Sequence, residues 1–344
     1  MKIAIIRNLS LGDSVIFSAF ILKLKELWYD DITIFSGTGL SFDYFSRLES
    51  IWIIKKVVRL DIKYNLLKKA MITLRYFKQF DLVIDTIQGS KLTSILSNIW
   101  WKKSLWFWEM GHYSHTYHLS AIDENSLILK KDFLLLQYFN IKNLNNKDFE
   151  LFYPLFKSDF DSLKNKLKQF TDFDIDRAFI VIHPTPKHKN RELNPRDWNN
   201  VIDYVVSTWK QVVIIGTPHD ETTISKIKDW KLIFKLHHIW LNIRETWAII
   251  KKSSLYIGVN SWPMRISVAL QKQSIVLNWP TGKYRIPDEK IYPFITNIKR
   301  KEKEIHCHDY IQEPMNCSFN EEGFSLCMST ITAEEIINEI GSHL

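Results

Sequence analysis

The stretch from residue 255 to residue 270, LYIGVNSWPMRISVAL, constrains the fold more than any other part of the chain. It opens with a short apolar run, 255–259, which suits a strand buried in a parallel sheet. Pro263 then fits the first turn of a helix, where a missing N–H group costs nothing. Apolar residues keep helical spacing from Met264 onward. The stretch therefore predicts a strand, a tight turn and a helix that begins at the carboxyl end of that strand.

The same alternation recurs along the chain and restarts after a polar, charged region at 158–176. Alternating strands and helices predict parallel sheets with right-handed crossovers. The expected fold class is α/β, with two doubly wound domains, residues 1–165 and 166–330, facing each other across a cleft. We expect a last amphipathic helix, in residues 331–344, to pack back on the N-terminal domain. The predicted strands are 2–6, 32–35, 51–60, 80–85, 179–182, 212–215, 232–236, 255–259 and 275–277, and the predicted helices are those from Asp13, 63–80, 92–100, 199–206, 221–228, 243–251, from Met264, and 332–340.

Composition narrows the class of protein. A chain of 344 residues with 46% hydrophobic residues is expected to fold into two soluble domains. It has no apolar run of 18 residues and no secretion signal, and its three cysteines fit a reducing cytoplasm. The net charge of +8 suits an anionic partner. Zinc-finger spacing and RNA-binding aromatic signatures are absent from the sequence, so nucleic acid is the weaker choice of partner.

The turn after the first predicted strand carries Arg7, Ser10, Gly12 and Asp13. A carboxylate at a helix N-terminus is stabilised as an anion, and if it faces a cleft it can accept a proton from a hydroxyl nucleophile. The plainer alternative is that Asp13 caps the helix. Two polar residues near the end of the fourth predicted strand likewise either line a cleft or close a turn: Asp85 and Gln88.

Three turns in the second half of the chain suit a diphosphate. The 260–263 turn leads into a helix N-terminus, where backbone N–H groups and Arg265 favour a phosphate. His183-Pro-Thr-Pro leads into a basic run, and Gly216 leads to Glu221, which could bind a ribose or base. The alternatives are an ordinary strand–helix unit, a solvated loop and a helix-starting glutamate. The basic run contains Lys187, His188, Lys189 and Arg191.

Two further clusters have both a functional and a structural interpretation. The cysteines, with two histidines beside the first, could hold zinc or iron, but they lack a CxxC pair and free thiols are the alternative. Four tryptophans around two lysines suit a membrane interface, or else a strand and helix in the core. The first cluster is Cys307, Cys317 and Cys327 with His306 and His308; the second is Trp100, Trp101, Trp106 and Trp108 with Lys102 and Lys103.

Taken together, these motifs resemble glycosyltransferase family 9, the ADP-heptose:lipopolysaccharide heptosyltransferases. The order of the motifs covers nearly the whole chain. The family's strand-Arg then Leu-Gly-Asp appears as IIRNLSLGD, its Asp-Leu-Val-Ile-Asp strand as residues 81–85, and its His-Pro-Gly turn as His183-Pro184-Thr185 before residues 191–194. Its Asp-Ser-Gly-Pro-x-His helix start is similar to residues 260–265, its Gly-Pro-Thr turn to Trp279-Pro280-Thr281, and its Cys-Met-x-x-Ile to residues 327–331.

The resemblance implies a GT-B arrangement of two Rossmann-like domains and sugar transfer with inversion. Asp13 would be the general base, and Arg191 would replace the family's Lys as a diphosphate clamp. No metal or cofactor would be needed, since cations and the helix dipole cover the leaving charge. The donor side would comprise Thr185, Lys189, Arg191, Gly216, Asn260, Ser261, Trp262, Pro263, Met264 and Arg265, and the acceptor side Arg7, Ser10, Gly12 and Gln88.

The implied substrates are a nucleotide sugar, ADP-heptose or similar, and an anionic lipid-linked glycan such as a lipopolysaccharide core. The implied place is the cytoplasm, with contact at the inner face of the inner membrane. Three positions depart from the family pattern. Asn260 occurs where the family has an acidic residue, Trp262 where it has glycine, and Arg265 where it has histidine. The alternative is therefore a non-catalytic homologue that binds a nucleotide sugar or glycan, or scaffolds other enzymes.

Overall fold

The computed structural model describes residues 1–7, 9–37, 39–60, 71–72, 74–76, 78–86, 101–106, 117–118, 135–141, 143–186, 191–278, 286–299 and 319–343. The chain divides into two compact units, Met1–Pro154 and Leu155–Leu344. The boundary falls earlier than the predicted 165/166 because α7 (Lys157–Phe170) packs against α10 (Ile243–Lys252). Glu245 of α10 accepts hydrogen bonds from Ser162 and Lys166 of α7, at 2.8 and 2.7 Å. The polar, charged region at which we placed the boundary therefore forms a helix of the second unit.

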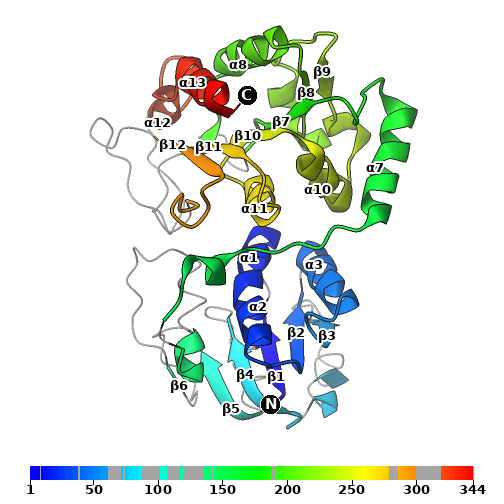
Figure 1. Cartoon of the computed structure of the whole chain (residues 1–344), viewed down its shortest axis with the longest axis vertical. Helices are drawn as coiled ribbons and strands as arrows, with labels where there is room; N and C mark the ends of the chain where they lie inside the picture. Colours follow the sequence, from blue (N-terminus) through cyan, green and yellow to red (C-terminus); the bar gives the residue numbers. More distant parts are fainter. Residues whose placement is uncertain are drawn as a thin grey trace. The chain divides into compact units, whose positions relative to one another are not determined.

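The first unit contains a parallel sheet with strand order β3-β2-β1-β4-β5-β6 (Figure 1). Its strands are β1 (Ile3–Ile6), β2 (Ile32–Ser36), β3 (Lys56–Arg59), β4 (Phe80–Asp85), β5 (Trp101–Trp106) and β6 (Tyr117–His118). The described helices are α1 (Leu11–Ile16), α2 (Ser18–Glu26) and α3 (Gly39–Ser50), with short 3-10 turns η1 (Leu135–Phe139) and η2 (Asn146–Phe149). β1 and β2 are buried along their whole length, as expected for strands covered on both faces.

The second unit repeats the plan with strand order β12-β11-β10-β7-β8-β9. Its strands are β7 (Phe179–His183), β8 (Gln211–Ile214), β9 (Ile233–Lys235), β10 (Leu255–Val259), β11 (Ser274–Asn278) and β12 (Ile295–Lys299). The remaining elements are α8 (Pro195–Ser207), η4 (Pro218–Asp220), α9 (Glu221–Ile224), η5 (His237–Ile239), α11 (Trp262–Ala269), α12 (Leu326–Ser329) and α13 (Ala333–His343). All strand pairings within both sheets are parallel, so the fold class is confirmed as two doubly wound α/β domains.

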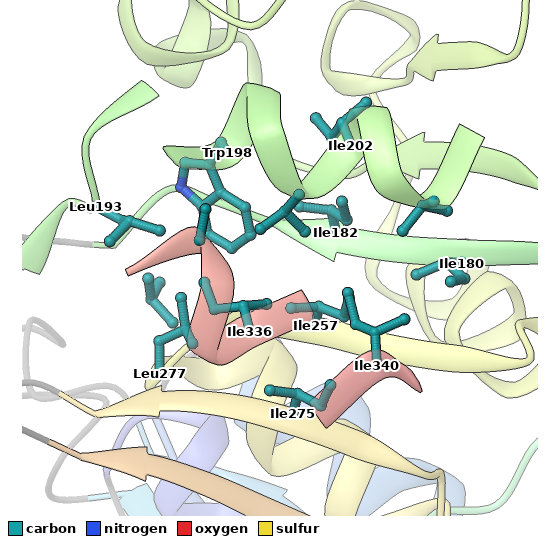
Figure 2. Close-up of a cluster of buried hydrophobic side chains, with 14 of the residues drawn as sticks. Ile180, Ile182, Leu193, Trp198, Ile202, Ile257, Ile275, Leu277, Ile336 and Ile340 are labelled. Carbon is teal, nitrogen blue, oxygen red and sulfur yellow. The ribbon is translucent and has the colours of Figure 1, made fainter. Parts of the chain in front are cut away.

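The C-terminal helix completes the core of the second unit. Ile336 and Ile340 of α13 lie in one buried cluster with Trp198 of α8 and strand residues such as Ile257 and Ile275 (Figure 2). The apolar stripe of α13 faces this sheet, and helical spacing of Ile336 and Ile340 provides that stripe. The helix therefore packs on the second unit, where we had expected the N-terminal domain.

Several predicted elements change in extent. The strand predicted at 51–60 is limited to β3, and 275–277 is followed by a further strand, β12. Residues 101–106 of the Trp/Lys cluster form β5, which pairs with β4 and β6. The predicted helix at 92–100 and most of 63–80 lie outside the described residues. Among the helices that the structure describes, none is long and apolar enough to span a membrane.

Candidate functional site

The first candidate turn joins β1 to α1. Ser10 occupies the N-cap position, and its hydroxyl donates to Oδ2 of Asp13 at 2.7 Å, while the Asp13 N–H lies 3.4 Å from Ser10 Oγ. The helix begins two residues earlier than predicted, so the capping interpretation of Asp13 is wrong: Ser10 is the cap. Asp13 is half-buried in the first helical turn, where its carboxylate is oriented by a hydroxyl and favoured as an anion.

Arg7 lies under this turn. It is buried, its Nη2 donates to the backbone oxygen of Asp13 at 3.0 Å, and its guanidinium stacks 4.3 Å from the centre of the Phe17 ring. A rigid, always-charged group in this position ties the helix start to the end of β1. Arg7 thus supports the turn. Gly12 is buried in the same turn, and Gln88 lies outside the described residues.

A second layer of hydroxyls supports the turn and was missed from sequence. Ser14 Oγ donates to the Ser10 carbonyl and lies 3.0 Å from Ser41 Oγ, and Ser41 donates to the Leu9 carbonyl at 2.8 Å. Ser41 comes from α3, and no local pattern links it to Ser14. Asp85 is fully buried at the end of β4, beside β1.

The second unit brings three predicted turns to neighbouring positions. Thr185 follows β7, Gly216 follows β8 and Asn260 follows β10, and these strands are adjacent in the order β10-β7-β8. Because all three strands are parallel, their carboxyl ends share one edge of the sheet. This is the edge where ligands bind in open α/β sheets.

His183 links two of these turns. Its Nδ1 lies 3.2 Å from Ser261 Oγ and its Nε2 lies 3.4 Å from Thr185 Oγ1. The imidazole is buried, and burial lowers the pKa of His183 to about 4. A neutral ring has one donor and one acceptor nitrogen, so it can fix both hydroxyls. His183 belonged to a recognised motif but was not among the predicted site residues.

Gly258 makes room behind this histidine. A Cβ at Gly258 would lie 2.5 Å from Oη of Tyr256 and 3.0 Å from the His183 carbonyl. Tyr256 points away from the face that carries Leu255, Ile257 and Val259, since successive side chains alternate along a strand. Burial raises the pKa of Tyr256, so the phenol stays protonated.

Asn260 belongs to a ladder of amides across the sheet edge. Its Nδ2 donates to Asn278 Oδ1 at 2.8 Å, and Asn278 Nδ2 donates to Asn297 Oδ1 at 2.8 Å. A carboxylate at 260 could not make the first of these donations. The departure from the acidic family pattern therefore has a local reason that sequence reasoning did not supply, since Asn278 and Asn297 lie in later strands.

The head of α11 holds the remaining predicted residues of this turn. Ser261 is its N-cap residue but makes no capping hydrogen bond with its side chain, which instead contacts His183 and the Val259 carbonyl. Pro263 and Met264 are buried, whereas Trp262 is exposed and Arg265 is half-buried. Among these residues, the backbone N–H groups of the first turn and the Arg265 side chain are the groups suited to an anion.

The third turn, at Gly216, is closely packed. A Cβ at Gly216 would lie 2.7 Å from Ile224 Cδ1. Glu221, at the start of α9, has its Oε2 2.6 Å from Nε2 of the buried His237. Thr223 of α9 donates to Glu192 at 2.9 Å, which ties α9 to the segment that follows the half-buried Arg191. Lys187, His188 and Lys189 lie outside the described residues.

Comparison with known proteins identifies this combination of folds and turns. A sequence model of the family described as "Glycosyltransferase family 9 (heptosyltransferase)" matches residues 77–314, more than half of the chain. The chain belongs to glycosyltransferase family 9. It is therefore a glycosyltransferase, and the matched segment contains the three turns of the second unit. The Asp13 turn lies before that segment.

Three relatives extend the comparison of this family 9 glycosyltransferase. It is 25% identical to a protein named lipopolysaccharide heptosyltransferase 1 from Campylobacter coli, over 91% of this chain and 96% of that protein. The solved family 9 glycosyl transferase from Veillonella parvula DSM 2008 shares 13% identity and a TM-score of 0.77, covering 99% and 96% of the two chains. The E. coli ADP-heptose lps heptosyltransferase II shares 13% identity and a TM-score of 0.72, covering 99% and 98%. At these identities the two structures support the fold.

The metal hypothesis for this glycosyltransferase stays a prediction. Cys307, Cys317 and the two adjacent histidines lie outside the described residues, and no metal-binding group of three or more His, Cys, Asp or Glu occurs within the part that is described. Cys327 is buried in the hydrophobic core of the second unit, and its Sγ lies 3.2 Å from Ser325 Oγ. Cys327 thus packs as a small apolar side chain.

Proposed function

We propose that this glycosyltransferase moves a heptose or related sugar, with inversion, from an ADP-linked donor to a lipopolysaccharide core or related surface glycan. The family membership and the names of the relatives support the substrates. The observation that carries the proposal is that the first unit contains an oriented carboxylate, Asp13 with Ser10, and that the second unit contains a hydroxyl and imidazole cluster at the edge of its sheet.

Donor binding is assigned to the second unit. Ser261 would donate its hydroxyl to the diphosphate while accepting from the protonated ring nitrogen of neutral His183, and Thr185 would donate to the other ring nitrogen and so fix the imidazole. The Arg265 and Arg191 guanidinium groups, with Lys189, would supply the positive charge that stabilises the departing ADP. Glu221 is exposed and could accept hydrogen bonds from the ribose, with His237 fixing its carboxylate.

Proton removal is assigned to Asp13. The acceptor hydroxyl oxygen would attack the anomeric carbon on the face opposite the ADP, forming the new glycosidic bond. The bond between that carbon and the diphosphate oxygen breaks, and its electron pair leaves with ADP. The hydroxyl proton passes to Asp13. The Ser10 hydrogen bond keeps the carboxylate in a single orientation, which favours transfer.

We further propose that the acceptor is an anionic lipid-linked glycan, reached in the cytoplasm at the inner face of the inner membrane. The net charge of +8 favours such an acceptor through long-range attraction. Because salt screens this long-range attraction, raising the ionic strength should weaken acceptor association more than donor association. The assignment requires neither a metal nor a cofactor.

A second candidate function is binding without catalysis. The exposed Trp262 side chain at the head of α11 favours it, because a large ring there competes with a ligand for space near the backbone. In that case the protein would bind a nucleotide sugar or glycan and release no product.

Calorimetric titration against ADP-heptose, other ADP-sugars and UDP-, GDP- and CMP-sugars tests the proposal, followed by detection of ADP release with a lipopolysaccharide acceptor. We expect preference for an ADP-sugar and acceptor-dependent ADP release. Binding without release in the presence of acceptor would favour the binding homologue. No binding to any nucleotide sugar by folded protein would overturn the proposed transfer from an ADP-linked donor.

A further inference from the structure

Left-handed backbone in this chain is concentrated at tryptophan. Seven non-glycine residues have positive φ within the described part: Trp28, Trp52, Lys78, Asn140, Trp209, Trp240 and Gln271. Four of the seven are tryptophan, although the whole chain has only 13 tryptophans in 344 residues. A bulky side chain in this region is a steric outlier, because its Cβ crowds the backbone.

The first two of these tryptophans end helices in a geometry made for glycine. After α2, Trp28 N–H donates to the Lys25 carbonyl and Tyr29 N–H to the Leu24 carbonyl, both at 3.0 Å. This pair of bonds is the Schellman motif, whose left-handed residue is usually glycine. Trp28 has φ 65° at that residue.

Trp52 repeats the arrangement after α3. Its N–H donates to the Glu49 carbonyl, and Ile53 N–H donates to the Leu48 carbonyl, both at 3.0 Å, with φ 61° at Trp52. Trp209 follows α8 with φ 61°, and its N–H donates to the Val206 carbonyl at 2.9 Å. Trp240 ends η5 with φ 48°. Tryptophan therefore occupies four positions at which the backbone is left-handed.

The four rings bury little surface that could offset this strain. Their exposed fractions are 86% for Trp28, 81% for Trp52, 78% for Trp209 and 68% for Trp240. By contrast, Trp198 and Trp247 lie in helices and are completely buried. The chain therefore contains two populations of tryptophan, one that builds cores and one that occupies strained, solvated helix ends.

Glycine is scarce in the same sequence. It occurs 10 times in 344 residues, against an ordinary share of roughly 7%. Trp262 also stands where the family pattern given above has glycine, at the exposed head of α11. A shortage of glycine and an excess of tryptophan at glycine positions have one common explanation.

We infer that the native protein carries glycine at positions 28, 52, 209 and 240, because a codon read here as tryptophan is decoded as glycine in the cell. UGG encodes tryptophan, whereas UGA is a stop codon that some genetic codes read as tryptophan and others as glycine. The inference assigns UGA to these four positions and UGG to Trp198 and Trp247. Position 262 is assigned to glycine as well, and its consequence for donor binding rests on the proposed function.

Peptide mass spectrometry of the protein from its native cells tests the inference directly, together with the gene sequence. Peptides that cover the four positions should have the mass of glycine, while those that cover Trp198 and Trp247 should have the mass of tryptophan. Tryptophan at the four positions in the native protein would overturn the inference. This measurement reads residue identity, so its outcome is independent of any activity.

Recombinant protein gives a second test. The variant with Trp28, Trp52, Trp209 and Trp240 all replaced by glycine should melt several degrees higher than the chain as printed, because strain is removed and no buried ring is lost. Gln271→Gly is the matched control: Gln271 has φ 52° in a Schellman motif after α11 but carries no ring. Trp198→Gly should melt lower. A lower melting temperature for the fourfold variant would contradict the inference.

The consequence for the donor turn is measured separately with Trp262→Gly. We expect tighter binding of ADP, by about tenfold or more, with an unchanged melting temperature. If mass spectrometry finds glycine at position 262 and no variant binds any nucleotide sugar, the glycine inference stands and the proposed function fails. If Trp262→Gly binds ADP more weakly, the proposed effect of position 262 on donor binding fails, and the residue identity is still decided by the peptide mass.

Discussion

The turns at Ser10 and at Ser261 share one local plan and use their serines in opposite ways. Each follows a buried strand, and each serine holds the N-cap position of the helix that comes next. Ser10 turns its hydroxyl onto Asp13, while Ser261 turns its hydroxyl away from α11, toward His183. The first turn thus presents an oriented carboxylate, and the second leaves the N–H groups of its helix for another acceptor.

This difference teaches that a serine at a helix start does not by itself define the chemistry of the turn. The chemistry of each turn depends on the partner of its serine hydroxyl. That partner is a carboxylate three residues later in the first turn and a buried imidazole from another strand in the second turn. A base and an anion site can therefore be built from the same supersecondary unit. Four changes test this contrast.

The largest expected effect is on catalysis at the first turn. Asp13→Asn keeps the shape of the side chain and removes its ability to take a proton, so kcat should fall by about 10²–10⁴-fold. The Kd for the donor should stay unchanged, because donor binding is assigned to the other turn. Steady-state kinetics and calorimetry measure the two quantities. Full turnover in Asp13→Asn would remove the contrast between the turns.

The second effect concerns His183 and pH. Since its pKa falls from 6.5 to about 4 on folding, the unfolded chain binds a proton below pH 6.5 that the folded chain refuses until about pH 4. Stability should drop through this window by about 3 kcal/mol. Urea unfolding at pH 7 and pH 4.5 should show a smaller drop for His183→Asn than for wild type. Equal drops would mean that His183 is not held neutral.

The third effect concerns the amide ladder beside the second turn. In Asn260→Asp a carboxylate oxygen would face Asn278 Oδ1, so two acceptors would meet where a donor met an acceptor. The free energy of unfolding should fall by about 1–2 kcal/mol at pH 7. Asn260→Ala, which removes the donor without adding an acceptor, should cost less. Chemical denaturation of both variants separates repulsion from a simple loss of the bond.

The smallest effect compares the two serines directly. Ser10→Ala should lower the free energy of unfolding by about 1 kcal/mol, since it removes a helix cap. Ser261→Ala removes no cap and should change stability by less than about 0.5 kcal/mol. It should instead weaken donor binding by roughly tenfold, the loss of one hydrogen bond to a charged group. If Ser10→Ala weakened donor binding and Ser261→Ala lowered the free energy of unfolding, the roles assigned to the two turns would be wrong.

Sequence periodicity predicted the regular elements well. The strand 255–259 and the helix after Pro263 appear where the apolar run and the proline suggested. Short or edge strands were harder, because a strand such as β12 has exposed positions and no clear apolar run. The Ser10 cap was missed because Asp and Ser are about equally favoured at the N-cap, and only the hydrogen bonds reveal which of the two caps the helix.

The candidate site was predicted in its parts and not in its connections. His183, Thr185 and Ser261 all lie in motifs that the sequence shows, but the contacts of the imidazole with both hydroxyls could not be predicted, since residues 183 and 261 are brought together only by the pairing of β7 with β10. The same holds for Ser41 beside Ser14 and for Asn278 beside Asn260. Contacts between distant segments are set by strand order, which local patterns do not encode.

The place of α13 has a consequence for how the chain is made. In the first unit, a return segment near its end closes the fold: Tyr44 donates to the Phe152 carbonyl and Arg47 to the Pro154 carbonyl. That unit can therefore fold while the rest is still being synthesised. The second unit lacks Ile336 and Ile340 from its core until α13 leaves the ribosome. The face of the sheet that α13 covers therefore stays exposed until that helix has been synthesised, and chaperones would protect this face during translation.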